Sequence, residues 1–155
     1  MRTALALLWI AFASAAQADC YPGAVVGIDL GTQGFGRPFL TIDAEGTASL
    51  RQRGGEAIEH RLDLTEPERG ALFSAVLPLS ALDGAAMQQA LPPTLPIADG
   101  IETTISLSLE GRCHQVGMRN SALLADRFPD IADLQTFRRI EELLIALVVR
   151  LQTGG

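Results

Sequence analysis

Two histidines, His60 and His114, are the only imidazoles of this 155-residue chain and its best candidates for acid–base or metal chemistry. Each takes an apolar position of a predicted strand: His60 lies between Ile58 and Leu62, and His114 is in line with Val116. If the two strands are neighbours, the rings could share a metal ion or a catalytic role. The alternative is a pair of partly buried, hydrogen-bonded histidines. No third ligand stands at zinc spacing, so the sequence predicts no metal site.

The compartment of the chain follows from its first residues. Arg2 supplies a positive charge, an apolar run follows, and Ala16-Gln17-Ala18 offers the small-x-small pattern that signal peptidase recognises. The run is shorter than the roughly 20 residues that a membrane anchor needs. We therefore expect an exported protein, periplasmic or secreted, without a stable membrane span. The predicted organisation is a signal peptide at 1–18, cleavage between Ala18 and Asp19, and a single domain at 19–155.

Both cysteines, Cys20 and Cys113, belong to the predicted mature domain. In an oxidising compartment an even pair most often forms a disulfide, and this pairing is the prediction. Two free thiols, one of them reactive, are the alternative. Lipidation of Cys20 is not expected. A lipoprotein signal has an aliphatic residue three positions before the cysteine and a small residue directly before it, whereas this chain has Gln17 and Asp19 there.

Charge and composition exclude several functional classes. Arginine and lysine together number 12 against 18 acidic residues, which argues against binding nucleic acid or an anionic membrane surface. All the basic residues are arginines. Walker-type phosphate binding and Schiff-base chemistry both need a lysine, so neither is expected.

A glycine-rich segment at 26–34 is similar to the first phosphate loop of actin-like ATPases and sugar kinases, in which a strand delivers an aspartate to a glycine turn. The chain lacks the second phosphate loop and the adenosine site of those families. We therefore predict a strand that ends in a glycine turn, and no nucleotide.

Other polar candidates have simpler interpretations. No G-x-S-x-G motif is present. Asp43 and Glu45 supply too few oxygens for calcium and are explained by a hairpin turn. Arg51, Arg53 and Arg61 are predicted to form a small basic patch on the outer face of the sheet, either solvated or facing an anionic or protein partner.

Hydrophobic periodicity predicts an α+β domain of two layers, in which a mostly antiparallel sheet carries two main helices on one face. Thr65 and Glu68 form a capping box for the first helix, and Asp130 is expected to cap the last one. The predicted strands are 25–30, 39–42, 47–53, 57–62, 101–109 and 113–118. The predicted helices are 65–77 and 130–151, with a short helical piece at 79–90.

Taken together, these elements resemble small exported bacterial α+β domains of unassigned function, and they are distantly similar to emfourin-type metalloprotease inhibitors. The likeness rests on residues 39–43 with Glu45-Gly46, the strand-to-helix passage at 62–77, Asp99-Gly100 before the strand at 101–109, the turn Glu110-Gly111-Arg112, and the closing helix. The resemblance implies an inhibitor or accessory role. No inhibitory residue is carried over, and the N-terminal arm at Cys20 and the glycine-rich turn at 31–36 both depart from the emfourin pattern.

The sequence thus predicts an exported binding or interaction module of the cell envelope, without a catalytic activity or a cofactor. An envelope or extracellular protein is the expected partner. The alternative is a small cofactor-free hydrolase that uses His60 or His114 with an acidic partner.

Overall fold

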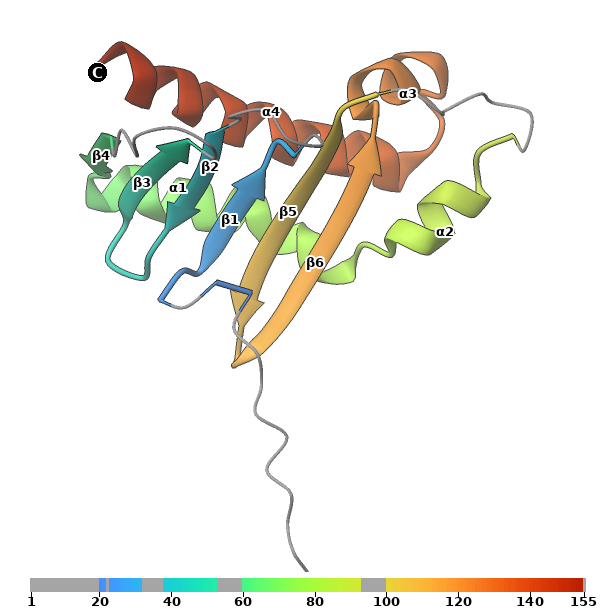
Figure 1. Cartoon of the computed structure of the whole chain (residues 1–155). Helices are drawn as coiled ribbons and strands as arrows, with labels where there is room; N and C mark the ends of the chain where they lie inside the picture. Colours follow the sequence, from blue (N-terminus) through green and yellow to red (C-terminus); the bar gives the residue numbers. More distant parts are fainter. Residues whose placement is uncertain (1–19, 22, 32–37, 53–59, 93–99, 155) are drawn as a thin grey trace, which may run out of the picture.

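The computed structural model describes residues 20–21, 23–31, 38–52, 60–92 and 100–154. The predicted signal peptide, the cleavage site between Ala18 and Asp19, and Arg53 lie outside the described residues. Six strands and five helical segments follow one another along the described chain (Figure 1).

All six strands belong to one antiparallel sheet, in the order β4-β3-β2-β1-β5-β6. The strands are β1 (Val26–Asp29), β2 (Pro38–Ile42), β3 (Thr47–Gln52), β4 (His60–Asp63), β5 (Glu102–Leu109) and β6 (Arg112–Arg119). The predicted strands are confirmed within a few residues at each end, while 57–59 lie outside the described residues. The β5–β6 turn places Glu110 and Gly111 at positive φ angles of 52° and 70°, as a tight two-residue hairpin turn requires.

Strand register gathers the apolar side chains on one face of the sheet. Directly opposed residues point to the same face, so the pairs Ile105–Ile28, Ile28–Leu40 and Leu40–Leu50 form one continuous row. All four side chains are buried. Because successive residues of a strand alternate between faces, the polar residues between them point to the other side.

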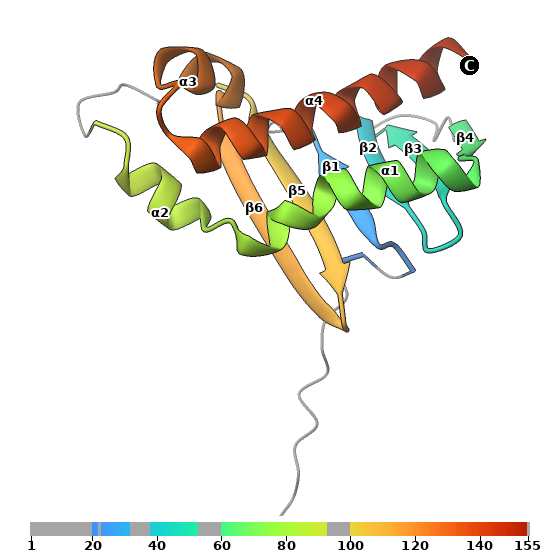
Figure 2. The same ribbon diagram turned by 180° about the vertical axis from the view of Figure 1, so that it is seen from behind.

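Two long helices cover that apolar face. They are α1 (Glu66–Val76) and α4 (Ala132–Thr153), and both lie on the same side of the sheet (Figures 1 and 2). Phe137 and Leu144 of α4 and Val76 of α1 are fully buried against the sheet layer. The predicted α+β fold is confirmed. Within the described ranges, no helix combines the length and the apolar character that crossing a bilayer requires.

Helix α1 begins as the sequence predicts. The backbone N–H and the hydroxyl of Thr65 both donate to Oε2 of Glu68, each at 2.8 Å, within a capping box. Arg150 of α4 donates to the other carboxylate oxygen of Glu68 at 2.8 Å, which links the two helices. The Thr65 backbone hydrogen bond, then the Thr65 hydroxyl and then Arg150, lower the pKa of Glu68 from 4.5 to about 2.

The shorter helices were only partly expected. After η1 (Leu77–Ala81), α2 (Gly84–Gln89) is capped by Asp83, which accepts hydrogen bonds from two backbone N–H groups. Helix α3 (Ser121–Arg127) was not predicted, because seven residues give too short a pattern to detect. The predicted cap of α4 is wrong. Its N-cap is Ile131, without a side-chain hydrogen bond, one residue after Asp130.

Candidate functional site

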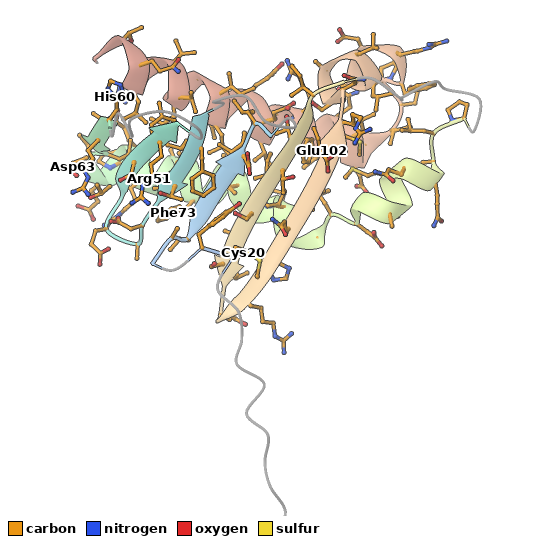
Figure 3. The ribbon with its side chains drawn as sticks, viewed as in Figure 1. Cys20, Arg51, His60, Asp63, Phe73 and Glu102 are labelled. Atoms are coloured by element: carbon orange, nitrogen blue, oxygen red, sulfur yellow. A yellow bond between two sulfur atoms is a disulfide. The ribbon has the colours of Figure 1, made fainter. Side chains whose placement is uncertain are left out.

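The two histidines occupy opposite edges of the sheet. His60 lies in β4 and His114 in β6, the two outermost strands. Five strand spacings of about 4.8 Å separate these strands, so β4 and β6 are about 24 Å apart across the sheet. Figure 3 shows His60 at the β4 edge, and Cys20 far from it toward β5. The condition for a shared site, that the two strands are neighbours, is therefore not met.

Each imidazole nevertheless lies on the apolar face, as predicted. His60 stands opposite Leu50 and His114 opposite Leu107, and both leucines are buried. The histidines themselves are half-buried. No group of three or more His, Cys, Asp or Glu side chains that could hold a metal ion occurs in the described part of the chain.

The predicted disulfide between Cys20 and Cys113 is confirmed. Their Cα atoms are 5.1 Å apart, and the bond spans 93 residues of sequence. Cys113 lies in the edge strand β6 at a position that alternates with the core-facing His114 and Val116. The disulfide is therefore on the helix-free face of the sheet, where it holds the start of the described chain.

From this anchor the chain crosses the helix-free face and places Tyr21 over β1. The N–H of Ala24 donates to the carbonyl of Tyr21 at 3.0 Å, which closes a turn before the strand. Gly27 lies under the ring: a Cβ atom built there would be 2.8 Å from both Cδ2 and Cε2 of Tyr21 and 2.7 Å from Oγ of Ser106. Only a residue without a side chain leaves room for the ring.

Phe39 of β2 completes the contact. The centroids of the Tyr21 and Phe39 rings are 4.4 Å apart and their planes are inclined at 70°, an edge-to-face arrangement. Beneath them, Ser106 is 2 % exposed and its hydroxyl donates to the carbonyl of Gly27 at 3.4 Å. The centre of the sheet is thus buried on both faces, by the helices on one side and by Tyr21 on the other.

This cover corrects one expectation. Strand alternation by itself puts Ser106 and Ser108 on the outer face of β5, where a wet surface is expected, yet Ser106 is buried and the hydroxyl of Ser108 has no hydrogen-bond partner among the described residues. Ser108 pairs with Cys113 across the β5–β6 ladder, beside the disulfide. The segment that starts at Cys20 therefore dries a part of the face that strand alternation alone would leave wet.

The remainder of the helix-free face is polar. Glu102 of β5 and Arg119 of β6 form an ion pair at 3.2 Å, with both side chains substantially exposed. Gly117 lies beside them, where a Cβ atom would be 3.3 Å from Oε1 of Glu102 and 3.4 Å from Oγ1 of Thr104. Figure 3 shows Glu102 near one end of β5.

The structure describes two of the three arginines of the predicted basic patch, Arg51 and Arg61. Arg51 pairs with Phe39 and Arg61 pairs with Ser49, so both arginines point to the helix-free face from neighbouring strands. Arg53 is outside the described residues. The patch therefore flanks the Tyr21–Phe39 contact on the β3–β4 side.

The hairpin carboxylates act as turn residues, as expected. Oδ1 of Asp43 accepts the N–H of Thr47 at 2.8 Å, and its carbonyl accepts the N–H of Gly46 at 3.2 Å. The backbone carbonyl of Glu45 accepts a hydrogen bond from Arg69 of α1 at 3.2 Å. The glycine-rich segment at 26–34 forms β1 up to Asp29, and its residues from 32 onward are outside the described residues.

A buried polar cluster lies away from the sheet and was not predicted. Glu141 of α4 is 3 % exposed, and its Oε2 accepts hydrogen bonds from Ser121 of α3 at 2.5 Å and from Arg138 at 2.8 Å. A buried carboxylate needs such donors, because its desolvation is otherwise costly. The cluster joins α3 to α4 and is not part of the helix-free face of the sheet.

Sequence reasoning missed Tyr21 and Phe39 as a pair. One available signal was Gly27, since a glycine inside a strand often marks a close approach of another group. A second was the adjacency of Tyr21 to Cys20, which a disulfide would carry onto the sheet. Neither signal predicts on which face of the sheet Tyr21 and Phe39 come into contact.

Comparisons of the chain with protein-family models, with curated proteins and with solved structures find no match. The resemblance to emfourin-type inhibitors stays a prediction.

Proposed function

We propose that the mature chain is an exported binding module that recognises an envelope or extracellular protein through the helix-free face of its sheet. The observation that carries this proposal is the asymmetry of the sheet. One face is apolar and buried under α1 and α4, whereas no helix of the described residues lies on the other. That face presents the Tyr21–Phe39 contact, flanked by Arg51 and by polar side chains.

The composition of this face suits a protein partner. Arginine is enriched among the residues that contribute most to protein–protein binding, and Arg51 and Arg61 point to this face from neighbouring strands. The rigid sheet fixes their positions before binding, which lowers the entropy cost of association. The disulfide supports export, because such bonds form in oxidising compartments.

The resemblance to emfourin-type inhibitors favours inhibition of an exported metalloprotease as the form that this binding takes. An accessory role beside an envelope enzyme is equally compatible with a cofactor-free domain. Titration of the mature domain into purified metalloproteases of the same envelope fraction separates the two roles.

A face-specific pull-down tests the proposal. The mature domain is the bait for an envelope fraction, beside variants that place a large charged side chain on the helix-free face, Ser49→Arg and Thr104→Arg. Ala146→Arg, at an exposed position of α4, is the matched control. We expect the captured protein to be lost with both face variants and kept with the control. Capture that survives both face variants, or is lost with Ala146→Arg alone, contradicts the proposal.

A further inference from the structure

The disulfide holds a short arm, which comprises the described residues 20, 21, 23 and 24, on the outer surface of the sheet. The arm joins β1 at Val25, whose N–H donates to Ile42 of β2 at 2.8 Å and whose carbonyl accepts from Ser108 at 2.7 Å. Before Val25, the arm is fixed by the Cys20–Cys113 bond and by the Tyr21 ring.

The place that Tyr21 fills is defined by three residues of three adjacent strands. Gly27 provides the floor, Phe39 one wall and Ser106 the other, and we call this place the aromatic seat. It holds a tyrosine ring because Gly27 has no Cβ atom, and an edge-to-face contact with Phe39 adds to the burial. Any aromatic side chain that approaches from the same side meets the same three residues.

We propose that the Cys20–Cys113 disulfide is a releasable latch, and that after its reduction the aromatic seat accepts an aromatic side chain of a protein partner. The inference rests on the proposed function, because it assigns a partner chemistry and a control to the same face. Tyr21 is then the intramolecular occupant that keeps only the seat closed while the bond is intact, whereas the rest of the helix-free face is the same in both states.

The release is an ordinary thiol–disulfide exchange with a dithiol reductant. Cys113 is exposed and Cys20 is half-buried, so a thiolate of the reductant attacks the sulfur of Cys113. The bond between the two cysteines breaks, and Cys20 leaves as a thiolate that takes up a proton. The second thiol of the reductant then attacks the mixed disulfide and expels Cys113. Two electrons pass to the protein, and the reductant ends as its own disulfide.

The packing indicates that the sheet survives this release. The buried apolar residues lie between the sheet and the helices, on the face opposite the arm. Release also opens the buried hydroxyl of Ser108, which has no partner among the described residues, to water. The arm can therefore leave at the cost of the Tyr21 contacts, while the core keeps its own.

The latch is tested with tyrosine as the probe, because Tyr21 is the only tyrosine of the chain. The mature domain labelled with 3-fluorotyrosine gives one ¹⁹F signal, which is followed before and after addition of dithiothreitol. We expect the signal to narrow and move to the position of free tyrosine on reduction, while the amide spectrum of the core strands is unchanged. The Cys20→Ser/Cys113→Ser variant should show the released signal without reductant. A signal that does not move, or a spectrum that collapses as a whole, overturns the latch.

The seat is tested with p-cresol, the side-chain analogue of tyrosine. In the disulfide-bonded Tyr21→Ala variant, p-cresol should cause saturable shifts of the Gly27 and Ser106 amide signals, and in the oxidised wild type it should not. Adding Gly27→Ala to that variant fills the seat with a methyl group and should abolish the shifts. Shifts that are absent in Tyr21→Ala, or that persist in the doubly substituted chain, overturn the seat. Both experiments use the domain without a partner, so their failure is distinguishable from failure of the pull-down.

Discussion

The ring of Tyr21 lies directly on the backbone of Gly27, with no room for a methyl group between them. A Cβ atom on Gly27 would be 2.8 Å from two ring carbons, whereas carbon atoms in good contact are about 3.5–4.0 Å apart. This contact makes the arm and the central strand depend on each other, although the arm contributes nothing to the core.

Replacement of Gly27 by alanine should displace Tyr21 while the disulfide stays intact. We expect the single tyrosine signal to move toward its free position, and the free energy of unfolding to fall by about 1–3 kcal/mol through overpacking. The control is Gly70→Ala in α1, where nothing lies within 4 Å of the new methyl group. An unmoved tyrosine signal in Gly27→Ala would contradict the geometry described here.

The buried pair of Ser121 and Glu141 should be important for stability. Ser121→Ala removes a hydrogen bond to a carboxylate that is 3 % exposed, so the free energy of unfolding should fall by about 1–3 kcal/mol in urea denaturation. Ser80→Ala removes a hydroxyl that donates to a backbone carbonyl at the surface and should change it by less than about 0.5 kcal/mol. Equal losses in the two variants would argue against the cluster.

Stability should depend on pH through Glu68. Its pKa is lowered in the folded protein from 4.5 to about 2, so the folded state binds the proton more weakly than the unfolded state does. The stabilisation is fully present above pH 4.5 and is lost as the pH falls through that range toward 2. Glu68→Gln should flatten this part of the stability curve, measured by thermal unfolding between pH 6 and 2. Glu66→Gln, which replaces the other carboxylate in the first turn of α1, should leave the pH dependence of stability as it is in the wild type.

Truncation of two adjacent leucines of α4 should lower the free energy of unfolding by very different amounts. Leu144 is fully buried, so Leu144→Ala should cost about 2–5 kcal/mol of the free energy of unfolding through lost burial and the cavity left behind. Leu143, about 100° further round the helix, is 37 % exposed, and Leu143→Ala should cost much less, about 0.5 kcal/mol. A large loss with Leu143→Ala would mean that this side of α4 is covered in solution.

The histidines should prove structural. His60→Ala and His114→Ala each remove a half-buried ring from the apolar face, so each should lower the free energy of unfolding by about 1 kcal/mol. Capture of the partner in the pull-down should be unchanged in both variants. Loss of a hydrolytic activity in one variant whose stability is intact would instead favour the hydrolase hypothesis.

Local structure was predictable where a local rule determines it. Alternation of apolar and polar residues defined the faces of β5, and the capping box of Thr65 and Glu68 marked the start of α1. The turn around Asp43 and the apolar spacing of α4 were readable for the same reason. Even the disulfide followed from counting two cysteines in a chain for which the sequence predicts an export signal. Each of these features depends on residues close in sequence or on composition.

The order of the strands required the tertiary structure. Alternation says which residues share a face but not which strands are neighbours, because pairing depends on contacts between distant segments. Here β1 lies between β2 and β5, and this places His60 and His114 at opposite edges instead of in one site. The same order brings Gly27, Phe39 and Ser106 side by side, and the Cys20–Cys113 bond then lays Tyr21 across them. The sequence by itself predicted the strands, the two long helices and the disulfide; only the packing of the sheet decided that the candidate site is an aromatic contact on its helix-free face.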